Sequence, residues 1–393
     1  MSRTILHADL NGFYAAVECL FKPQYRRVPM AVAGDPSHRH GIILAKNELA
    51  KARGVKTAET IWQAWQKCPE LVLVPPRHDK YYEYSLMVNA IYGQYTDLVE
   101  PFGIDESWLD VTNVGHLFGS GEEIADTLRK RIRTELDLTI SVGVSFNKVF
   151  AKLGSDYKKP DATTVITEEN YRDIVFPLPV ETLLYVGRSA RQALNTLGIQ
   201  TIGGLAKADR GLIARRLGKI GEQIHDYANG LDHSPVTSAA DGQGMKSVGN
   251  GMTFRHDLAG WEEIASAVAF LADEVAYRMR RYGVKCRTIS VTIRAPDFNS
   301  ISRQRTLGTP TNLTMEVRDV ALQIIKQVWN AKKLIRMLTI TGSGLVGEQT
   351  AEQLSLFGGE NARGKLERAE SAVYQLRERF GRDAVKLGMA KQP

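Results

Sequence analysis

The stretch Gly103-Ile104-Asp105-Glu106-Ser107-Trp108-Leu109-Asp110 decides how this 393-residue chain is interpreted. Its two adjacent carboxylates lie between two short runs, residues 98–102 and 108–111, that each have the composition of a β-strand. The acids therefore fall at or near the turn of a predicted β-hairpin. Successive strand side chains point to opposite faces, so Asp105 and Glu106 converge only where the strand ends and the longer glutamate reaches around.

A third carboxylate, Asp9, follows the apolar run at residues 4–8 and precedes a helical start at residues 13–18. It therefore lies at a strand-to-helix junction, where α/β sheets tend to place functional groups. Converging carboxylates repel each other unless positive charge lies between them. Three acids at strand ends suit one or two Mg²⁺ ions that hold a triphosphate and activate an oxygen nucleophile. For Asp105 and Glu106 taken alone, an exposed turn with ordinary solvated acids is an equally good interpretation.

The periodicity of the chain predicts several domains of different classes. Residues 1–166 alternate strand-like runs with helical stretches, which predicts an α/β domain. Its expected strands are residues 4–8, 30–33, 41–45, 71–74 and 139–144, and its clearest helices are residues 81–96 and 121–135. Short helices separated by glycine are expected at residues 167–230. Residues 233–245, rich in Ser, Ala, Gly and Pro, predict a flexible linker.

Beyond the linker the pattern predicts an α+β domain. Strands are expected at residues 284–294, 301–307 and 337–343, with helices at 261–282 and 314–330. In the first of these strands the side chains of Thr288, Ser290, Thr292 and Arg294 share one face. Hydroxyls and a guanidinium on an exposed sheet face fit a phosphate backbone, although an ordinary solvated face is the alternative.

The net charge of +7 is concentrated in this second domain. Residues 246–347 carry 15 Lys and Arg against 8 Asp and Glu, a surplus of 7 that equals the excess of the whole chain. A concentrated positive surface is typical of a polyanion partner, most commonly nucleic acid. A contribution to solubility alone is the alternative.

Two classes of protein are disfavoured by the sequence. No apolar run approaches the length of a membrane span, and the first residues lack the pattern of a secretory signal, so we expect a cytoplasmic protein with no membrane partner. Cys19, Cys68 and Cys286 are too few and too scattered for a disulfide framework or a zinc site.

The C-terminal tail contains Gln353-Leu354-Ser355-Leu356-Phe357 within a polar, glycine-flanked stretch. Apolar anchors in such a stretch are costly unless they dock somewhere. Docking on the chain's own domain is one explanation, and binding to a partner is the other. A charged amphipathic helix is expected at residues 365–380, with no role legible from its sequence.

The combined pattern resembles the Y-family translesion DNA polymerases and, within them, the DinB or DNA polymerase IV branch. The resemblance covers residues 1–357. It is carried by three motifs in the same order, at residues 7–18 (HADLNGFYAAVE), 103–110 (GIDESWLD) and 141–152 (SVGVSFNKVFAK), with SDYKKP following at residues 155–160.

The resemblance implies a right-hand polymerase fold with a helical thumb and small fingers. Its domains would be a palm (residues 1–22 and 77–166), fingers (23–76), a thumb (167–232), a linker (233–245), a DNA-binding little finger (246–346) and a tail (347–393). The implied activity is template-directed, low-fidelity translesion synthesis in DNA repair. The implied partners of the monomer are primer-template DNA, deoxyribonucleoside triphosphates and a bacterial sliding clamp that binds Gln353, Leu354, Ser355, Leu356 and Phe357.

The resemblance also implies roles for individual residues. Asp9, Asp105 and Glu106 would hold two Mg²⁺ ions, with a backbone carbonyl from Leu10 as a further ligand. Phe13 and Tyr14 would lie beneath the sugar, with Tyr14 as the steric gate that selects deoxyribonucleotides. Without the resemblance, a core-packing aromatic is the preferred interpretation of Tyr14. Lys159 would contact the triphosphate.

One departure from the family concerns the fingers, where members commonly place a Tyr and, three residues later, an Arg. The aligned positions here are Glu48 and Lys51. Lys51 still supplies charge to the nucleotide, though not a bidentate fork. We expect Glu48 to point elsewhere or to pair with a lysine, since it would repel phosphate.

Two other functions remain to be weighed. A nucleotidyl cyclase or another palm-type two-metal enzyme would need the same acids, but the thumb and little finger argue against it. A clamp-recruited DNA-binding scaffold with weak or no catalysis is the alternative from another class, and the presence of all three carboxylates argues against that one.

Overall fold

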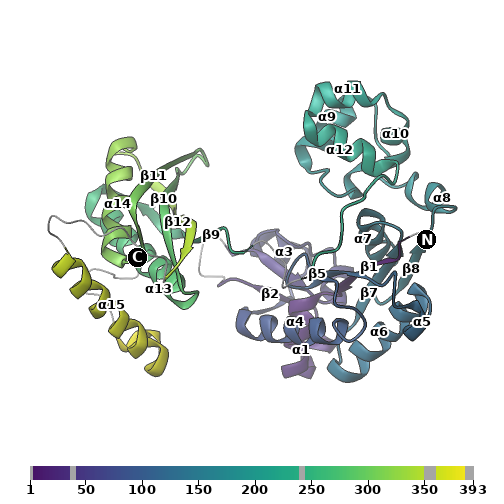
Figure 1. Cartoon of the computed structure of the whole chain (residues 1–393), viewed down its shortest axis with the longest axis horizontal. Coiled ribbons are helices and arrows are strands. Elements are labelled where there is room, and N and C mark those ends of the chain that lie inside the picture. The colour runs from purple at the N-terminus through teal and green to yellow at the C-terminus, as the bar shows by residue number, and fades with distance from the viewer. Residues whose placement is uncertain (1–2, 36–40, 239–243, 349–359, 386–393) are drawn as a thin grey trace. The chain divides into compact units, whose positions relative to one another are not determined.

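A computed structural model describes residues 3–35, 41–238, 244–348 and 360–385 (Figure 1). The chain forms two compact units, Met1–Gly242 and Gln243–Pro393, whose boundary falls within the expected linker. Among the helices that the described residues form, none combines the length and the apolar character that a membrane crossing requires.

The first unit is built on a five-stranded sheet of order β5-β6-β1-β7-β8, in which only β7 and β8 are parallel. The strands are β1 (Ile5–Leu10), β5 (Val99–Pro101), β6 (Glu106–Asp110), β7 (Ile140–Ser145) and β8 (Thr163–Ile166). Five helices accompany them: α1 (Phe13–Phe21), α4 (His78–Tyr92), α5 (Gly115–Phe118), α6 (Gly121–Leu136) and α7 (Lys148–Tyr157). The sheet is the α/β domain that the sequence predicts, with β8 as a strand that the sequence did not indicate.

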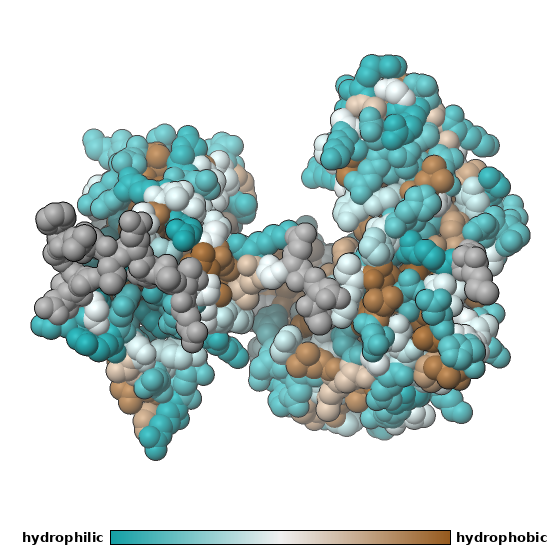
Figure 2. All heavy atoms as spheres, in the orientation of Figure 1, coloured by the Kyte–Doolittle hydropathy of each residue, from teal (hydrophilic) through white to brown (hydrophobic). Residues whose placement is uncertain are grey.

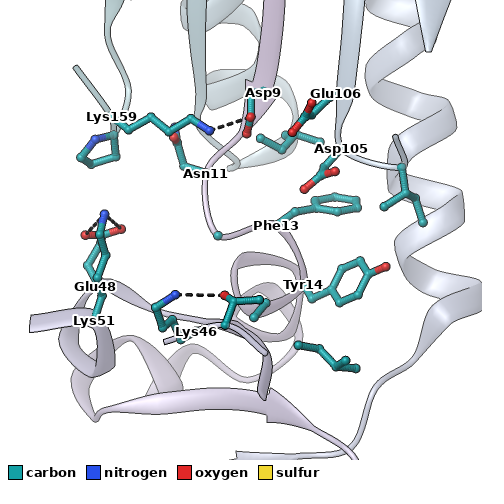
Figure 3. A pocket seen from close by; sticks show the side chains of 17 residues that line it. Asp9, Asn11, Phe13, Tyr14, Lys46, Glu48, Lys51, Asp105, Glu106 and Lys159 are labelled. Atoms are coloured by element: carbon teal, nitrogen blue, oxygen red, sulfur yellow. Dashed lines mark hydrogen bonds and ion pairs between the residues drawn. The ribbon is translucent and has the colours of Figure 1, made fainter. Parts of the chain in front are cut away.

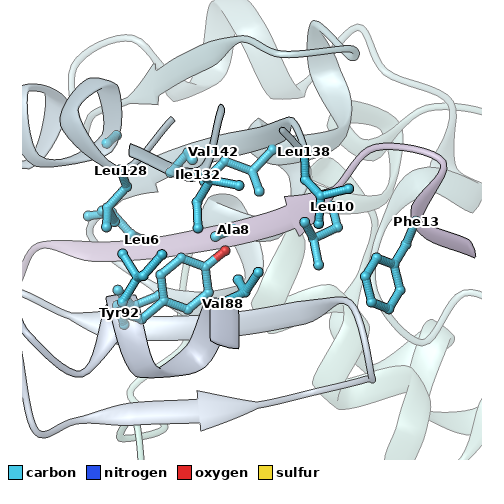
Figure 4. Packing of buried hydrophobic residues seen from close by; sticks show 14 of the residues in the cluster. Leu6, Ala8, Leu10, Phe13, Val88, Tyr92, Leu128, Ile132, Leu138 and Val142 are labelled. Atoms are coloured by element: carbon cyan, nitrogen blue, oxygen red, sulfur yellow. The ribbon is translucent and has the colours of Figure 1, made fainter. Parts of the chain in front are cut away.

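The core of this sheet lies around β1, whose six residues are all buried. Leu6, Ala8 and Leu10 of β1 face helices α4 and α6, which contribute Tyr92 and Ile132 among others (Figure 4). The opposite face of the sheet is covered by α7, which contacts β7 and β1. A fully buried central strand explains why residues 4–8 read as a continuous apolar run.

A second, smaller sheet is formed by residues between α1 and α4. It has three strands in the order β3-β2-β4. The elements of this segment are η1 (Pro23–Arg27), β2 (Met30–Ala33), β3 (Ile43–Lys46), α2 (Glu48–Ala52), α3 (Ile61–Lys67) and β4 (Val72–Val74). Helix α3 begins with a complete capping box formed by Thr60 and Gln63, which fixes its start.

The rest of the first unit is helical, in agreement with the prediction for residues 167–230. It comprises α8 (Tyr171–Val175), η2 (Val180–Thr182), α9 (Arg188–Thr196), α10 (Ile202–Lys207), α11 (Arg210–Leu217) and α12 (Lys219–Ala228). These helices share an apolar core with Val149, Phe150 and Leu153 of α7.

The second unit is an antiparallel sheet of order β11-β10-β12-β9, as expected of an α+β domain. Its elements are β9 (Ser247–Leu258), α13 (Gly260–Arg281), β10 (Val284–Arg294), β11 (Ser300–Thr311), α14 (Thr314–Val328), β12 (Ile335–Gly347), α15 (Glu360–Phe380) and η3 (Arg382–Ala384). Ile289, Val291 and Ile293 of β10 are buried against α13 and α14, which confirms the predicted apolar face. Hydrophilic residues cover most of the visible surface of both units (Figure 2).

The linker differs from the flexible segment that its composition predicts. Arg3 donates a hydrogen bond to the carbonyl of Ser234 (2.8 Å), and the backbone NH of Thr237 donates to Glu100 (2.8 Å). Val236 is 4% exposed and packs in a small cluster with Trp108. The first half of the linker is therefore held against the first unit by contacts that its polar composition does not reveal.

The close packing of α7 on the sheet generates a prediction about Gly143 of β7. A Cβ atom added at Gly143 would lie 2.5 Å from the backbone nitrogen of Ser155 and closer still to the carbonyl oxygen of Ala151. Because both are backbone atoms of α7, we expect Gly143→Ala to cost at least about 1–3 kcal/mol of unfolding free energy. The measurement is chemical unfolding followed by tryptophan fluorescence.

The matched control is Gly115→Ala, since nothing lies within 4 Å of a Cβ added there. This variant should unfold at the wild-type denaturant concentration. Equal midpoints for Gly143→Ala and wild type would contradict the packing described for α7.

Candidate active site

The antiparallel pairing of β1 with β6 brings the three predicted acids together. Asp9 lies directly opposite Glu106 in the register, and the backbone NH of Leu10 donates to the carbonyl of Asp105 (3.0 Å). The three carboxylates face a cavity of about 430 Å³ (Figure 3). Asp105 occupies the turn and Glu106 begins β6, so the turn predicted from the sequence is where the acids converge.

Two lysines from the region of α7 offset the charge of these acids. The ammonium of Lys159 lies 2.6 Å from Asp9, and that of Lys152 lies 2.7 Å from Glu106. Lys159 was expected at the site as a triphosphate contact. Lys152 was part of a quoted motif, but no role was assigned to it because its contact with Glu106 depends on how α7 packs against the sheet.

A buried histidine completes the surroundings of Glu106. Nε2 of His7 lies 3.4 Å from the Glu106 carboxylate, and Nδ1 lies 2.8 Å from the hydroxyl of Ser155. Burial lowers the pKa of His7 to about 4. The His7 ring also meets Trp108 edge-on, with 5.2 Å between ring centroids. His7 was not identified as a site residue from the sequence, although it lies two positions before Asp9.

The carboxylates differ in their preference for a proton. Burial raises the pKa of Asp9, against the opposing charge of Lys159. Burial and then the charge of Glu106 raise the pKa of Asp105. Burial also favours the neutral form of Glu106, but the nearby His7 ring and the hydrogen bond and charge of Lys152 outweigh burial and lower the pKa of Glu106 to about 2. Asp9 and Asp105 would therefore be stabilised in their charged forms by additional positive charge.

The donor set fits a hard divalent cation. All three side chains offer carboxylate oxygens, the ligands that Mg²⁺ prefers. The Asp105 carboxylate has no ion pair with any residue that the structure describes. In these same parts of the chain, no three His, Cys, Asp or Glu side chains already form a closed ligand group. Asp9 and Glu106 instead form ion pairs with Lys159 and Lys152, respectively. Both lysines would have to move for a metal ion to bind.

The two aromatic residues after Asp9 have different environments. Phe13 is buried in the core at 3% exposure, whereas Tyr14 is partly exposed, and both line the cavity. The ring of Tyr14 stacks on Tyr81 of α4, with 4.1 Å between centroids and 15° between planes. One face of the Tyr14 ring therefore packs against Tyr81, and Tyr14 also lines the cavity. Its side chain is not fully buried in the core.

The support beneath Tyr14 was missed by sequence reasoning. The hydroxyl of Tyr81 donates to Glu18 (2.7 Å), which also accepts two hydrogen bonds from Arg77, at 3.0 and 2.6 Å. Glu18 is 2% exposed, so its charge depends on these partners. Glu18 lies 59 positions from Arg77 in the sequence, and no local pattern indicates that they meet.

The wall of the cavity opposite the acids carries Lys46, Glu48 and Lys51 (Figure 3). Glu48 and Lys51 pair with each other at 3.3 Å, as expected if Glu48 is not to repel phosphate. Both side chains are more than half exposed, so this pair contributes little stability. Lys46 donates a hydrogen bond to the hydroxyl of Thr57 (3.0 Å) and was not singled out from the sequence.

The cavity gives no information about two other predicted sites. Gln353, Leu354, Ser355, Leu356 and Phe357 lie outside the described residues. The polar face of β10 belongs to the second unit, where Thr292 pairs with Ser302 and Arg294 with Ser300 of β11, each at 3.1 Å. These hydroxyl pairs lie on the face opposite the buried side chains of β10.

Comparisons with known proteins show the family of the chain. The impB/mucB/samB family profile matches residues 8–156, and the profile of its C-terminal domain matches residues 245–356. The chain is 46% identical to DNA polymerase IV of Acetivibrio thermocellus over 100% of its own length and 98% of the relative's. It is 38% identical to DNA polymerase IV 1 of Bacillus subtilis over 98% and 93% of the two chains.

A solved structure shares the fold. A Y-family DNA polymerase chimera of Dbh and Dpo4 superposes with a TM-score of 0.78 at 23% identity, covering 87% of this chain and 99% of the chimera. The family profiles, the full-length relatives and the shared fold lead to one conclusion: the chain belongs to the impB/mucB/samB family, on the DNA polymerase IV branch of the Y-family DNA polymerases.

Proposed function

We propose that this cavity joins an incoming deoxyribonucleoside triphosphate to the 3′ hydroxyl of a primer, with two Mg²⁺ ions held by Asp9, Asp105 and Glu106. The protein is accordingly a template-directed DNA polymerase of the translesion type. The observation that carries the proposal is the convergence of three carboxylates on one cavity through the Asp9–Glu106 register. The backbone carbonyl of Leu10 is the proposed fourth ligand.

When bound, the two ions would lower the pKa of the primer hydroxyl and neutralise charge on the triphosphate and the departing pyrophosphate. The chain's own residues supply the rest. His7 and Lys152 keep Glu106 ionised through the contacts described above. Lys159, 2.6 Å from Asp9, is close enough to exchange that carboxylate for a phosphate oxygen of the nucleotide. Lys51 would contribute further charge once it leaves Glu48.

Selection of the sugar is assigned to Tyr14, with Phe13 beneath it. The stacking of Tyr14 on Tyr81, and the hydrogen bond from Tyr81 to Glu18, hold the Tyr14 ring against α4. A ring held in this position would collide with an added 2′ hydroxyl. This argument supports the steric-gate role over the alternative of a core aromatic.

The second unit is the proposed DNA-binding domain. Its basic surplus and the hydroxyl face of β10 suit contacts with phosphate oxygens, which would make binding salt-sensitive and nearly independent of sequence. We assign the palm to residues 1–22 and 77–166, the fingers to 23–76, the thumb to 167–232, the linker to 233–245, and the little finger to 246–346.

The remaining assignments concern the tail, the assembly and the compartment. We propose that residues 353–357 bind a sliding clamp, and that the protein acts as a monomer in the cytoplasm. A clamp-recruited scaffold without catalysis is less well supported, because the convergence of Asp9, Asp105 and Glu106 would then have no use.

Asp105→Asn should lower primer extension at least about a hundredfold, because it removes a metal ligand while keeping the shape of the side chain. Extension of a labelled primer by the purified protein in Mg²⁺ measures the effect. Asp97→Asn is the matched control, since Asp97 is an exposed acid that precedes β5. Extension by Asp105→Asn at the wild-type rate would remove Asp105 from the catalytic site.

Tyr14→Ala should raise ribonucleotide incorporation relative to deoxyribonucleotide incorporation by about tenfold or more, because the ring no longer excludes a 2′ hydroxyl. The ratio of the two kcat/KM values on one primer-template measures the change. Tyr82→Ala, an exposed tyrosine of α4, serves as control. An unchanged ratio in Tyr14→Ala would mean that another residue selects the sugar.

Deleting residues 353–357 should abolish stimulation by a bacterial sliding clamp and leave basal extension intact, because the deletion removes only the proposed docking peptide. Extension with and without clamp loaded on the primer-template provides the measurement. Full stimulation of the deletion variant would exclude these residues as the clamp contact.

A further inference from the structure

The charges that line the cavity are unequally neutralised. Lys159 lies against Asp9, and Lys51 lies against Glu48. Lys46 lines the same cavity, and its ammonium forms no ion pair with a carboxylate among the residues that the structure describes. The ammonium of Lys46 donates a hydrogen bond to the neutral hydroxyl of Thr57. Lys46 is therefore the lining lysine whose charge is available to an anionic ligand without breaking an existing ion pair.

The backbone around Lys46 is held rigidly. Asn47, the next residue, accepts hydrogen bonds from the backbone NH groups of Met30 (3.1 Å) and Ala50 (3.0 Å). Its amide also donates to the carbonyls of Tyr25 (3.0 Å) and Val28 (2.8 Å). These bonds fix the end of β3 and the start of α2. Lys46 thus projects from a preorganised position, which lowers the entropy cost of binding a ligand.

The same backbone lies directly against the loop that follows Asp9. Gly12 has a positive φ of 55°, and a Cβ added there would meet the carbonyl oxygen of Lys46 at 3.1 Å. The acids and Lys46 are therefore opposite walls of one cavity (Figure 3). On one side, a ligand that spans the cavity must bind to cations that the carboxylates attract. On the other side, it must bind to an ammonium group.

We propose that Lys46 binds the triphosphate of the incoming nucleotide and is the principal phosphate contact from the 23–76 domain. This inference rests on the proposed function and specifies how its substrate is held. Lys51 is a weaker contact, because the negative charge of Glu48 lies 3.3 Å from its ammonium and opposes a phosphate there. Burial and the charge of Lys51 lower the pKa of Lys46, so a phosphate next to it would stabilise its ammonium form.

The test measures nucleotide binding without turnover. Wild type and variants are mixed with a dideoxy-terminated primer on its template and titrated with the complementary deoxyribonucleoside triphosphate in Mg²⁺. Lys46→Met keeps the aliphatic stem and removes the charge. Its Kd should rise about tenfold, the loss expected for one charge-assisted hydrogen bond. Lys46→Arg should stay within about threefold of wild type, because it retains a cation with hydrogen-bond donors.

Two controls separate a phosphate contact from a structural effect. Lys67→Met removes the same charge from the same domain, but Lys67 pairs with Glu59 and does not line the cavity, so its Kd should equal that of wild type. The inhibition constant of inorganic triphosphate, measured by its competition with the nucleotide, should be about tenfold higher for Lys46→Met than for wild type. A purely structural role of Lys46 would leave that competition unchanged.

The inference and the proposed function fail in different ways. If wild type extends primers but Lys46→Met binds nucleotide within twofold of wild type, Lys46 is not the phosphate contact. Equal losses in Lys46→Met and Lys67→Met would also overturn the inference, since the effect would then be one of net charge. If wild type does not extend primers at all, the proposed function itself is wrong.

Discussion

Repulsion among three carboxylates where β1 ends and β6 begins is the constraint on which the site depends. The register of β1 and β6 places Asp9 opposite Glu106, and the turn adds Asp105. Lys152 and Lys159 lie within ion-pair distance of Glu106 and Asp9 and reduce this repulsion. Lys152 belongs to α7 and Lys159 follows its end at Tyr157; this helix approaches the sheet closely because Gly143 has no side chain. The packing of one helix therefore sets the electrostatics of the cavity.

The part of the cavity lined by Tyr14 depends on a second buried charge. Glu18 is nearly inaccessible and is satisfied by Arg77 and Tyr81, and Tyr81 in turn supports the ring of Tyr14. The position of the Tyr14 ring is thus coupled to a hydrogen-bonded group in the core. Asp9, Glu106, Tyr14 and Lys46 are presented by strands and helices rather than by loops, which favours precise substrate placement.

The features that were predicted from the sequence are those that depend on local sequence pattern. The acids, the hairpin and most strands follow from apolar runs and turns, and β10 was predicted with its observed bounds. β9 was not, because Gly249 and Gly251 disfavour a strand. The structure accepts them because Thr341 and Thr339 of β12 pack over both glycines. The roles of Lys152, Tyr81 and Lys46 were also missed, since they arise from contacts between elements far apart in the chain.

The most direct test of this account is a crystal structure of the protein with primer-template, nucleotide and Mg²⁺, stalled by a dideoxy-terminated primer. The account predicts divalent ions between Asp9, Asp105 and Glu106, with Lys159 moved from Asp9 to the triphosphate. A nucleotide bound in this cavity with the three carboxylates uncoordinated, and with Lys152 and Lys159 still paired to them, would contradict it.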